Sequence, residues 1–206
     1  MTQTPPPLHP VDACYLLLAS QSPRRSRLLQ EAGYAITVVP SHADEEDAVP
    51  ETVTDIVVAN ARIKGRAVIQ KHTFEKRDKA TVLVAADTLV AQGARVYSKP
   101  ADIGEAHHFL NSLGGRYHQV HTGVFLYHFE KQQAVSFFVT SRVLMRGLDF
   151  GQRRALFREV NPLDKAGAYG YQDSKYIVAH LDGSESNVIG LPMERLAVEL
   201  AKLLGV

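Results

Sequence analysis

Hydrophobic side chains follow two patterns along this chain, short unbroken runs and stripes at helical spacing. Residues 15–19 and 81–86 are almost wholly apolar, which predicts two buried strands. Between them, residues 54–72 place apolar side chains on one side of a helix. Ser22 and Pro23 are typical of a helix start, shortly after the first predicted strand. The chain therefore begins with strands and helices in alternation.

The same alternation continues toward the C-terminus. A hairpin turn is predicted at Gln92-Gly93, and the capping pattern of Asp102 and Glu105 starts another helix. The remaining predicted strands span residues 34–40, 117–129, 134–145 and 176–181, the remaining helices 149–160 and 192–204, and the longest loops 161–175 and 182–190. Because hairpins occur beside strand–helix–strand units, we predict an α/β fold with a mixed sheet and flanking helices.

Composition and charge narrow the class of protein. The chain has 206 residues, 45% of them apolar, which suits one sizeable domain. The proline-rich residues 1–10 indicate a flexible tail, so we predict the folded domain at residues 11–206. The 23 basic and 22 acidic residues nearly balance. A nucleic-acid or anionic-membrane binder needs a broad positive field, so we expect neither partner.

The chain shows no mark of secretion or membrane insertion. Its single cysteine, Cys14, allows no internal disulfide, and residues 1–10 lack the pattern of a signal peptide. No apolar run approaches the roughly 18 residues of a membrane span. We therefore expect a cytoplasmic protein.

Polar and basic side chains follow the first predicted strand. Ser20 and Ser22 lie in the turn, and Arg24 and Arg25 fall in the first turn of the predicted helix. The partial positive charge at a helix N-terminus disfavours arginines there. Two interpretations stay open: a phosphate-like anion binds above the turn, or the helix is simply capped and its arginines are solvated.

Carboxylates follow two of the predicted strands. The acidic residues 44–47 come after the strand at 34–40, and Asp87 ends the apolar run at 81–86. If they meet at one edge of the sheet, they would hold Mg²⁺ or Mn²⁺, which prefer oxygen ligands. A solvated loop is the alternative for residues 44–47, whereas an unpaired buried carboxylate at position 87 would be costly.

Three further polar residues are candidates for ligand binding. Lys64 emerges from the apolar side of its predicted helix, Lys99 follows the hairpin, and Gln172 follows a turn of small residues. Each lysine would suit a phosphate as a point charge, and a glutamine can pair with donors and acceptors of a base. Snorkelling lysines and an ordinary glycine-rich turn are the alternatives. The nine histidines show no metal-binding spacing.

Six stretches of sequence carry a family resemblance. In chain order they are LASQSPRR, AADTLV, SKP, LGGRYHQVHTGV, DKAGAYGYQ and SNVIGLP. Together they resemble the motifs of the Maf family of nucleotide pyrophosphatases, over residues 15–203. The resemblance implies a Maf/ITPase-like α/β fold with two lobes around a central cleft, often as a homodimer. It also implies hydrolysis of a nucleoside triphosphate to the monophosphate and pyrophosphate, assisted by Mg²⁺ or Mn²⁺.

The resemblance also implies roles for individual residues. Asp87 would be the base that activates water and, with Glu45, a ligand of the divalent ion. The implied phosphate-binding residues are Ser20, Ser22, Arg25, Lys64 and Lys99. Arg24, Thr88 and Gln172 are similar to the family branch that acts on dTTP and UTP, whereas the 7-methyl-GTP branch has tryptophan for the first arginine.

Two alternatives accompany this hypothesis. One is a 7-methyl-GTP pyrophosphatase of the same family. Residues 173–175 depart from the glycine-rich sequence usual after the glutamine, which leaves the base selectivity open. The other is a nucleotide-binding regulator of septum formation without catalysis. Release of pyrophosphate from a panel of nucleotides would separate an enzyme from a binder.

Overall fold

The computed structural model describes residues 9–43, 52–71, 78–172 and 175–206. Most of the predicted tail at residues 1–10 lies outside these ranges, and the first helix begins at Pro10. The helices are α1 (Pro10–Ala13), α2 (Pro23–Glu31), α3 (Val53–Lys71), α4 (Ile103–Leu113), α5 (Phe150–Glu159), α6 (Glu185–Ile189) and α7 (Met193–Leu204), with two 3₁₀ helices, η1 (Ala166–Ala168) and η2 (Lys175–Ile177). The strands are β1 (Cys14–Leu18), β2 (Ile36–Val38), β3 (Ala80–Gln92), β4 (Arg95–Tyr97), β5 (Tyr117–His128), β6 (Gln133–Met145) and β7 (Val178–Asp182).

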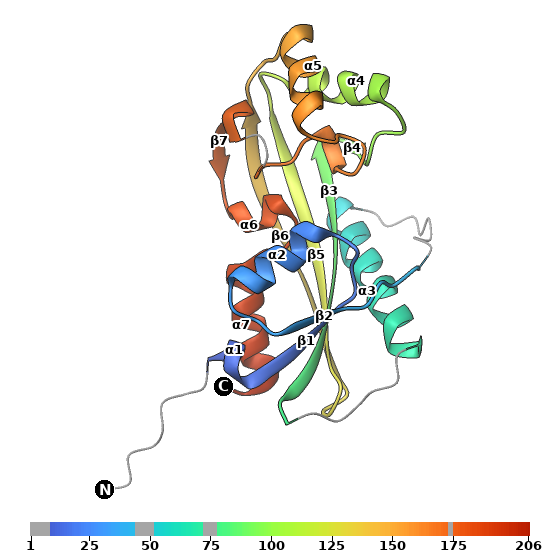
Figure 1. Ribbon diagram of the computed structural model, residues 1–206, viewed down its shortest axis with the longest axis vertical. Coiled ribbons are helices and arrows are strands. Elements are labelled where there is room, and N and C mark those ends of the chain that lie inside the picture. Colours follow the sequence, from blue (N-terminus) through green and yellow to red (C-terminus); the bar gives the residue numbers. More distant parts are fainter. Residues whose placement is uncertain (1–8, 44–51, 72–77, 173–174) are drawn as a thin grey trace, which may run out of the picture.

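The strands form the predicted mixed sheet. Within the described residues its order is β2-β1-β3-β5-β6-β7, and β4 pairs with β3. β1 runs parallel to both β2 and β3, whereas the pairs β3–β5, β5–β6 and β6–β7 are antiparallel. Figure 1 shows β3, β5 and β6 running along the length of the molecule, with helices on both faces. The predicted α/β class is confirmed.

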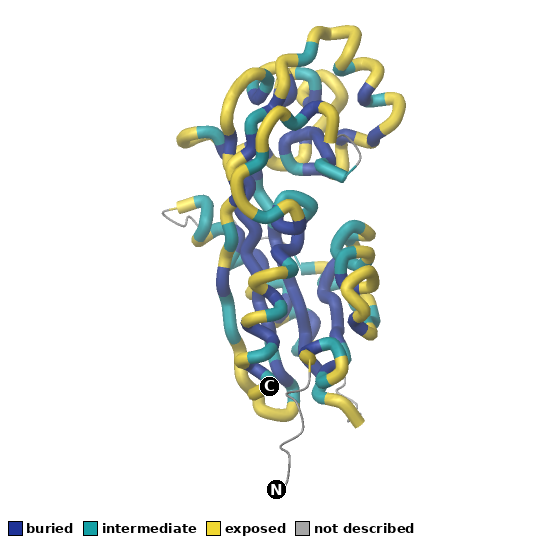
Figure 2. The backbone as a smooth tube through the Cα atoms, turned by 90° about the vertical axis from the view of Figure 1, so that its left-hand side faces the viewer, coloured by how far each residue is buried: buried dark blue, intermediate teal, exposed yellow. Residues whose placement is uncertain are grey.

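The strand pleat divides the apolar side chains between separate clusters. In β1, Leu16 and Leu18 pack with α2 and α7 on one face of the sheet, while Leu17 packs with α3 on the other. A third cluster, around Phe109 and Leu156 under α4 and α5, lies toward the opposite end of the molecule. The long strands thus join two lobes, and their middle parts are buried (Figure 2).

Two of the predicted segments differ clearly from the structure, one because of residues distant in the sequence and one because of a local helix cap. The strand predicted at residues 81–86 runs on to Gln92, because Asp87 has buried partners for its carboxylate and does not end the strand. The loop predicted at residues 182–190 contains helix α6, whose N-cap Ser184 accepts a hydrogen bond from the backbone N–H of Asn187.

Gly123 lets α3 approach the sheet closely. It lies in β5 directly opposite Asp87 of β3. A Cβ atom at this position would lie 2.3 Å from the carbonyl carbon of Val57 in α3, so only glycine fits. This approach brings one side of α3 over the middle of β3, where the polar residues of both elements meet.

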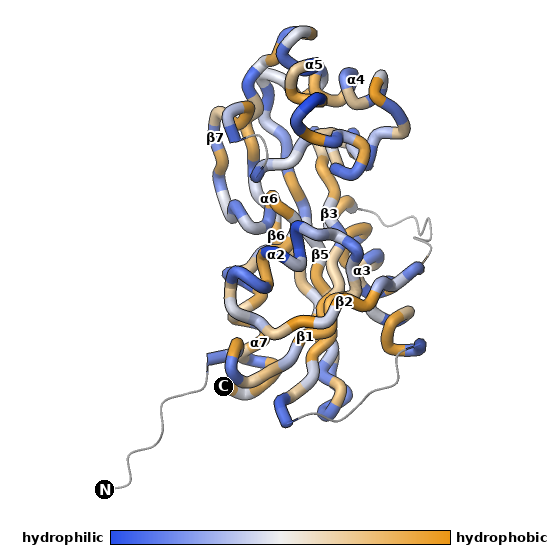
Figure 3. Tube along the Cα trace, viewed as in Figure 1, coloured by the Kyte–Doolittle hydropathy of each residue, from blue (hydrophilic) through white to orange (hydrophobic). Residues whose placement is uncertain are grey.

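Hydrophobic residues follow the strands in the middle of the molecule, and hydrophilic residues concentrate in the turns at its ends (Figure 3). In the part of the chain that the structure describes, no helix is both long enough and apolar enough to cross a membrane.

Candidate active site

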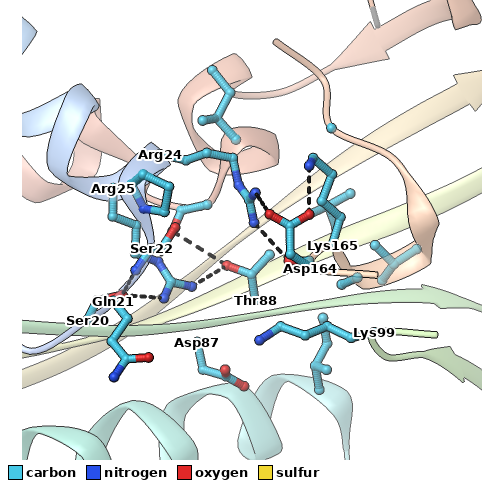
Figure 4. Close-up of a pocket in the computed structure, with 18 of the residues that line it drawn as sticks. Ser20, Gln21, Ser22, Arg24, Arg25, Asp87, Thr88, Lys99, Asp164 and Lys165 are labelled. Atoms are coloured by element: carbon cyan, nitrogen blue, oxygen red, sulfur yellow. Dashed lines mark hydrogen bonds and ion pairs between the residues drawn. The ribbon is translucent and has the colours of Figure 1, made fainter. Parts of the chain in front are cut away.

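A pocket of about 730 Å³ lies between the start of α2, the middle of β3, the loop at residues 161–172 and the end of α6. Pockets of this size accommodate small molecules such as nucleotides. The pocket is lined by nearly all the side chains that the sequence singled out, namely Ser20, Ser22, Arg24, Arg25, Lys64, Asp87, Thr88, Lys99 and Gln172. Figure 4 labels all of these except Lys64 and Gln172. Glu45 lies outside the described residues.

The turn between β1 and α2 forms one wall of the pocket. The hydroxyl of Ser20 accepts a hydrogen bond from the backbone N–H of Ser22, at 3.1 Å, which closes the turn. Ser22 is the N-cap residue and Pro23 occupies the first helical position, as predicted. The turn therefore presents a helix N-terminus and two serine hydroxyls to the pocket.

Arg25 fastens this turn to two other elements. Its guanidinium donates to the hydroxyl of Ser20 at 3.2 Å, to the hydroxyl of Thr88 at 3.0 Å and to the carbonyl of Gly190 at 2.8 Å. These contacts hold α2 against β3 and against the end of α6. Arg25 is thus a cation fixed in place before any ligand enters.

Arg24 reaches across the pocket to the loop of the other lobe. Its guanidinium contacts the carboxylate of Asp164 at 3.3 Å and donates to the carbonyl oxygen of the same residue at 3.2 Å (Figure 4). Lys165, which is almost fully buried, donates to the other carboxylate oxygen of Asp164 at 2.7 Å. Asp164 therefore lies between two cations that both line the pocket.

Asp87 lies at the floor of the pocket and is only 7% exposed. Lys64 donates to one oxygen of its carboxylate at 2.6 Å, and Asn60 donates to the other at 3.0 Å. Burial by itself would raise the pKa of Asp87, but the charge and hydrogen bond of Lys64, the amide of Asn60 and the charge of Arg25 together lower this pKa below its ordinary value. Asp87 is therefore ionised at neutral pH.

Asn60 was not predicted, although the sequence held a signal for it. It precedes Lys64 by four residues in α3, so the two side chains share one side of the helix and reach the same carboxylate. A second polar residue four positions before a lysine, on an otherwise apolar helix side, could have identified this pair.

The loop at residues 161–172 also contributes neutral residues to the pocket. Gln172 lines it together with Tyr169 and Gly170. The hydroxyl of Tyr169 hydrogen-bonds to Nε2 of His118 at 2.7 Å. Burial lowers the pKa of His118 to about 4, so this histidine is neutral at pH 7 and supports the loop without adding charge.

The donors in the pocket can be tested against the divalent ion that the resemblance implies. Among the described residues, no three histidine, cysteine or acidic side chains come close enough together to hold a metal ion. Mg²⁺, however, is commonly bound by one or two carboxylates together with substrate phosphates. The donor chemistry of Asp87 therefore fits an ion that binds together with a nucleotide.

Comparisons with known proteins agree with the sequence motifs. Residues 15–203 match the family model described as Maf-like protein. The chain is 36% identical to the dTTP/UTP pyrophosphatase of Bacillus mycoides, over 90% of this chain and 93% of that protein. It is 39% identical to the dTTP/UTP pyrophosphatase of Myxococcus xanthus, over 88% and 89%. A solved structure, that of the Staphylococcus aureus Ham1 protein, covers 92% of this chain and 99% of its own at 15% identity, with a TM-score of 0.49. The chain belongs to the Maf family.

Proposed function

We propose that this protein hydrolyses dTTP and UTP to the nucleoside monophosphate and pyrophosphate. The observation that carries the proposal is a buried carboxylate, bound by Lys64 and Asn60, at the floor of a pocket whose other charged side chains are mostly cationic. Those cations are Arg24, Arg25, Lys64, Lys99 and Lys165. The names of relatives more than one third identical supply the reaction and the bases.

The cations account for binding of a triphosphate. Arginine and lysine side chains bind phosphate oxygens strongly where water is partly excluded. The start of α2 adds a helix N-terminus, which attracts anions. Figure 4 shows Lys99 extending toward the floor of the pocket near Asp87, opposite the α2 turn. A triphosphate placed between them would meet positive charge on both sides.

Asp87 acts in this proposal as the general base. It removes a proton from a water molecule, the resulting hydroxide attacks the α-phosphorus, and the bond from this phosphorus to the oxygen bridging to the β-phosphorus breaks. Pyrophosphate leaves with the electrons of that bond and is neutralised by the surrounding cations. A divalent ion, Mg²⁺ or Mn²⁺, would neutralise phosphate charge when bound through Asp87.

Lys64 would regulate the basicity of Asp87 during this cycle. In the resting pocket its ammonium group keeps the carboxylate ionised. The oxygens of an incoming triphosphate would compete for the same ammonium group. Loss of the contact would let burial raise the pKa of Asp87, which makes the carboxylate a stronger base.

Replacement of Lys64 by Met is expected to shift the acid side of the pH–activity profile upward, by about one pH unit or more. The ionised form of Asp87 is the active one, and activity is lost as the pH falls through its pKa. Without Lys64, its charge and its hydrogen bond no longer lower this pKa while burial still raises it, so the pKa rises relative to the wild-type value. The measurement is kcat/KM for dTTP from about pH 4 to about pH 9.

The matched control is Lys71→Met, in the last turn of the same helix and exposed. It should leave the profile unchanged. If the acid side of the pH–activity profile of Lys64→Met lies at the same pH as in the wild type, the role given to Lys64 is contradicted.

Replacement of Arg24 by Trp is expected to reduce the preference for dTTP and UTP over other nucleotides by about tenfold. The change removes both contacts to Asp164, and with them the link to the loop that carries Gln172. The measurement is the ratio of kcat/KM for dTTP to that for dGTP. Arg27→Trp is the control, because Arg27 is exposed in the same helix. An unchanged ratio in Arg24→Trp would remove Arg24 from base selection.

A nucleotide panel tests the proposal as a whole. The eight common ribo- and deoxyribonucleoside triphosphates and 7-methyl-GTP are each incubated with the protein and Mg²⁺ or Mn²⁺, and pyrophosphate is measured. We expect the fastest release from dTTP and UTP. Fastest release from 7-methyl-GTP would support the other branch, and binding without release would support a regulator.

The predicted homodimer and cytoplasmic location stay predictions.

A further inference from the structure

A series of hydrogen-bonded hydroxyl groups, called here the hydroxyl chain, extends from the pocket into the protein interior. The hydroxyl oxygens of Thr88 in β3 and Thr122 in β5 lie 3.0 Å apart. The hydroxyl of Thr122 in turn donates to the carbonyl of Asn187 in α6 at 3.2 Å. Thr122 and Asn187 are completely buried, and Thr122 does not line the pocket. At the pocket end of these hydrogen-bonded hydroxyl groups, the guanidinium of Arg25 donates to Thr88 at 3.0 Å.

The hydrogen bonds between these hydroxyl groups have one favoured direction of donation. Each hydroxyl has a single proton. The carbonyl of Asn187 lies in the last turn of a short helix, where carbonyl groups lack partners within the helix, so it takes the proton of Thr122. The oxygen of Thr122 then accepts the proton of Thr88, whose own oxygen accepts from Arg25. The sequence of donors therefore runs from Arg25 through Thr88 and Thr122 to Asn187.

Thr122 offers the hydroxyl of Thr88 a nearer acceptor than the carbonyl to which Arg25 also donates. The other acceptor near the hydroxyl of Thr88 is the carbonyl of Gly190, at 3.5 Å. That carbonyl already accepts from Nε of Arg25 at 2.8 Å. Without the oxygen of Thr122, the proton of Thr88 would turn to Gly190 and weaken the contact that holds Arg25.

We infer that Thr122 is a positioning residue: acting through Thr88, it sets the guanidinium of Arg25 for the triphosphate. The inference rests on the proposed function, in which Arg25 binds phosphate. A buried site with few alternative acceptors makes such a chain sensitive to the loss of one hydroxyl. The residue was not evident from the sequence, because its two partners come from two other elements, β3 and α6.

The test compares Thr122→Val, which removes the hydroxyl at nearly the same shape, with Thr122→Ser, which keeps it. We expect Thr122→Val to raise KM for dTTP about three- to tenfold, with kcat changed less than about twofold. Thr122→Ser should restore KM to within about twofold of the wild-type value. The control Thr140→Val removes a hydroxyl of the same sheet that pairs with His121, and should leave both constants unchanged.

Two kinetic results would overturn the inference. One is an equal rise of KM in the valine and serine variants, because the effect would then come from packing. The other is a full additional rise when Thr122→Val is added to Thr88→Val, because Thr122 would then act by another route.

Thermal unfolding tests the chain of hydroxyls without reference to activity. We expect Thr122→Val to lower Tm in both backgrounds, because its contact with the Asn187 carbonyl is lost in each, but to lower it less in the Thr88→Val background, where the contact with Thr88 is already absent. Equal shifts in both backgrounds would overturn the inference even if no nucleotide were hydrolysed. If the Tm shifts are unequal but the wild-type protein hydrolyses no nucleotide, the proposed function is rejected. The role of Thr122 in triphosphate binding is then rejected too, whereas the hydrogen bonds between the hydroxyl groups are still supported.

Discussion

Replacement of Asp87 by Asn is expected to reduce kcat for dTTP by about 10²–10⁴-fold, the usual contribution of a general base. Asparagine has nearly the same shape, and its carbonyl oxygen can still accept from Lys64 or Asn60. It has no negative charge and cannot accept a proton from water near neutral pH. The measurement is steady-state hydrolysis of dTTP with saturating Mg²⁺, with circular dichroism to check the fold.

The control for this variant is Asp182→Asn, which removes an exposed carboxylate from the edge strand β7. It should retain wild-type kcat. If Asp87→Asn kept the wild-type rate as well, Asp87 would not be the base, and the reaction would need another acceptor for the proton of water.

Replacement of Gly123 by Ala is expected to destabilise the protein by about 3 kcal/mol or more. The added Cβ would overlap the backbone of Val57, so α3 must move away from the sheet or the strand must bend. The displacement would also separate Asn60 and Lys64 from Asp87, and hydrolysis should fall in the protein that remains folded. The measurement is urea unfolding, followed by activity below the transition.

Gly147→Ala is the matched control, because a Cβ at Gly147 would have no atom within 4 Å and its backbone does not need glycine. This variant should unfold like the wild type. A Gly123→Ala protein with wild-type stability would mean that α3 is not held in place by its close approach to β5.

Local sequence signals predicted most elements of the fold. The run at residues 15–19 became β1, the capping pair Asp102 and Glu105 starts α4, and the turn at Gln92-Gly93 joins β3 to β4. The side chain of Asp102 accepts from the backbone N–H of Glu105, as a helix N-cap requires. These features depend on neighbours within a few residues, so one segment of sequence contains enough information.

The errors arose where distant residues decide the outcome. We predicted that a strand ends at Asp87, since a charged residue interrupts the apolar run there. Its partners, Asn60 and Lys64, belong to another element and are not visible in the local sequence. Likewise, the contact of Arg24 with Asp164 joins residues 140 positions apart. A hydrophobic pattern predicts which side of an element is buried, but it does not predict which polar groups meet there.

The sequence predicted which residues form the candidate site, but it did not predict most of the contacts between them. All of its predicted members within the described residues line one pocket, because the ordered motifs reported positions that the fold brings together. Asn60 and Thr122 were missed, since each contacts the pocket residues from behind or beside them. Of the two predicted carboxylates, Asp87 lines the pocket and Glu45 lies outside the described residues.

The most direct test of the central claim is to follow dTTP with ³¹P nuclear magnetic resonance while the protein and Mg²⁺ are present, using Asp87→Asn as the inactive reference. Cleavage between the α and β phosphates predicts equal amounts of dTMP and pyrophosphate, with no dTDP at any time. Formation of dTDP and orthophosphate, or a spectrum that stays unchanged with the wild-type protein, would contradict the account.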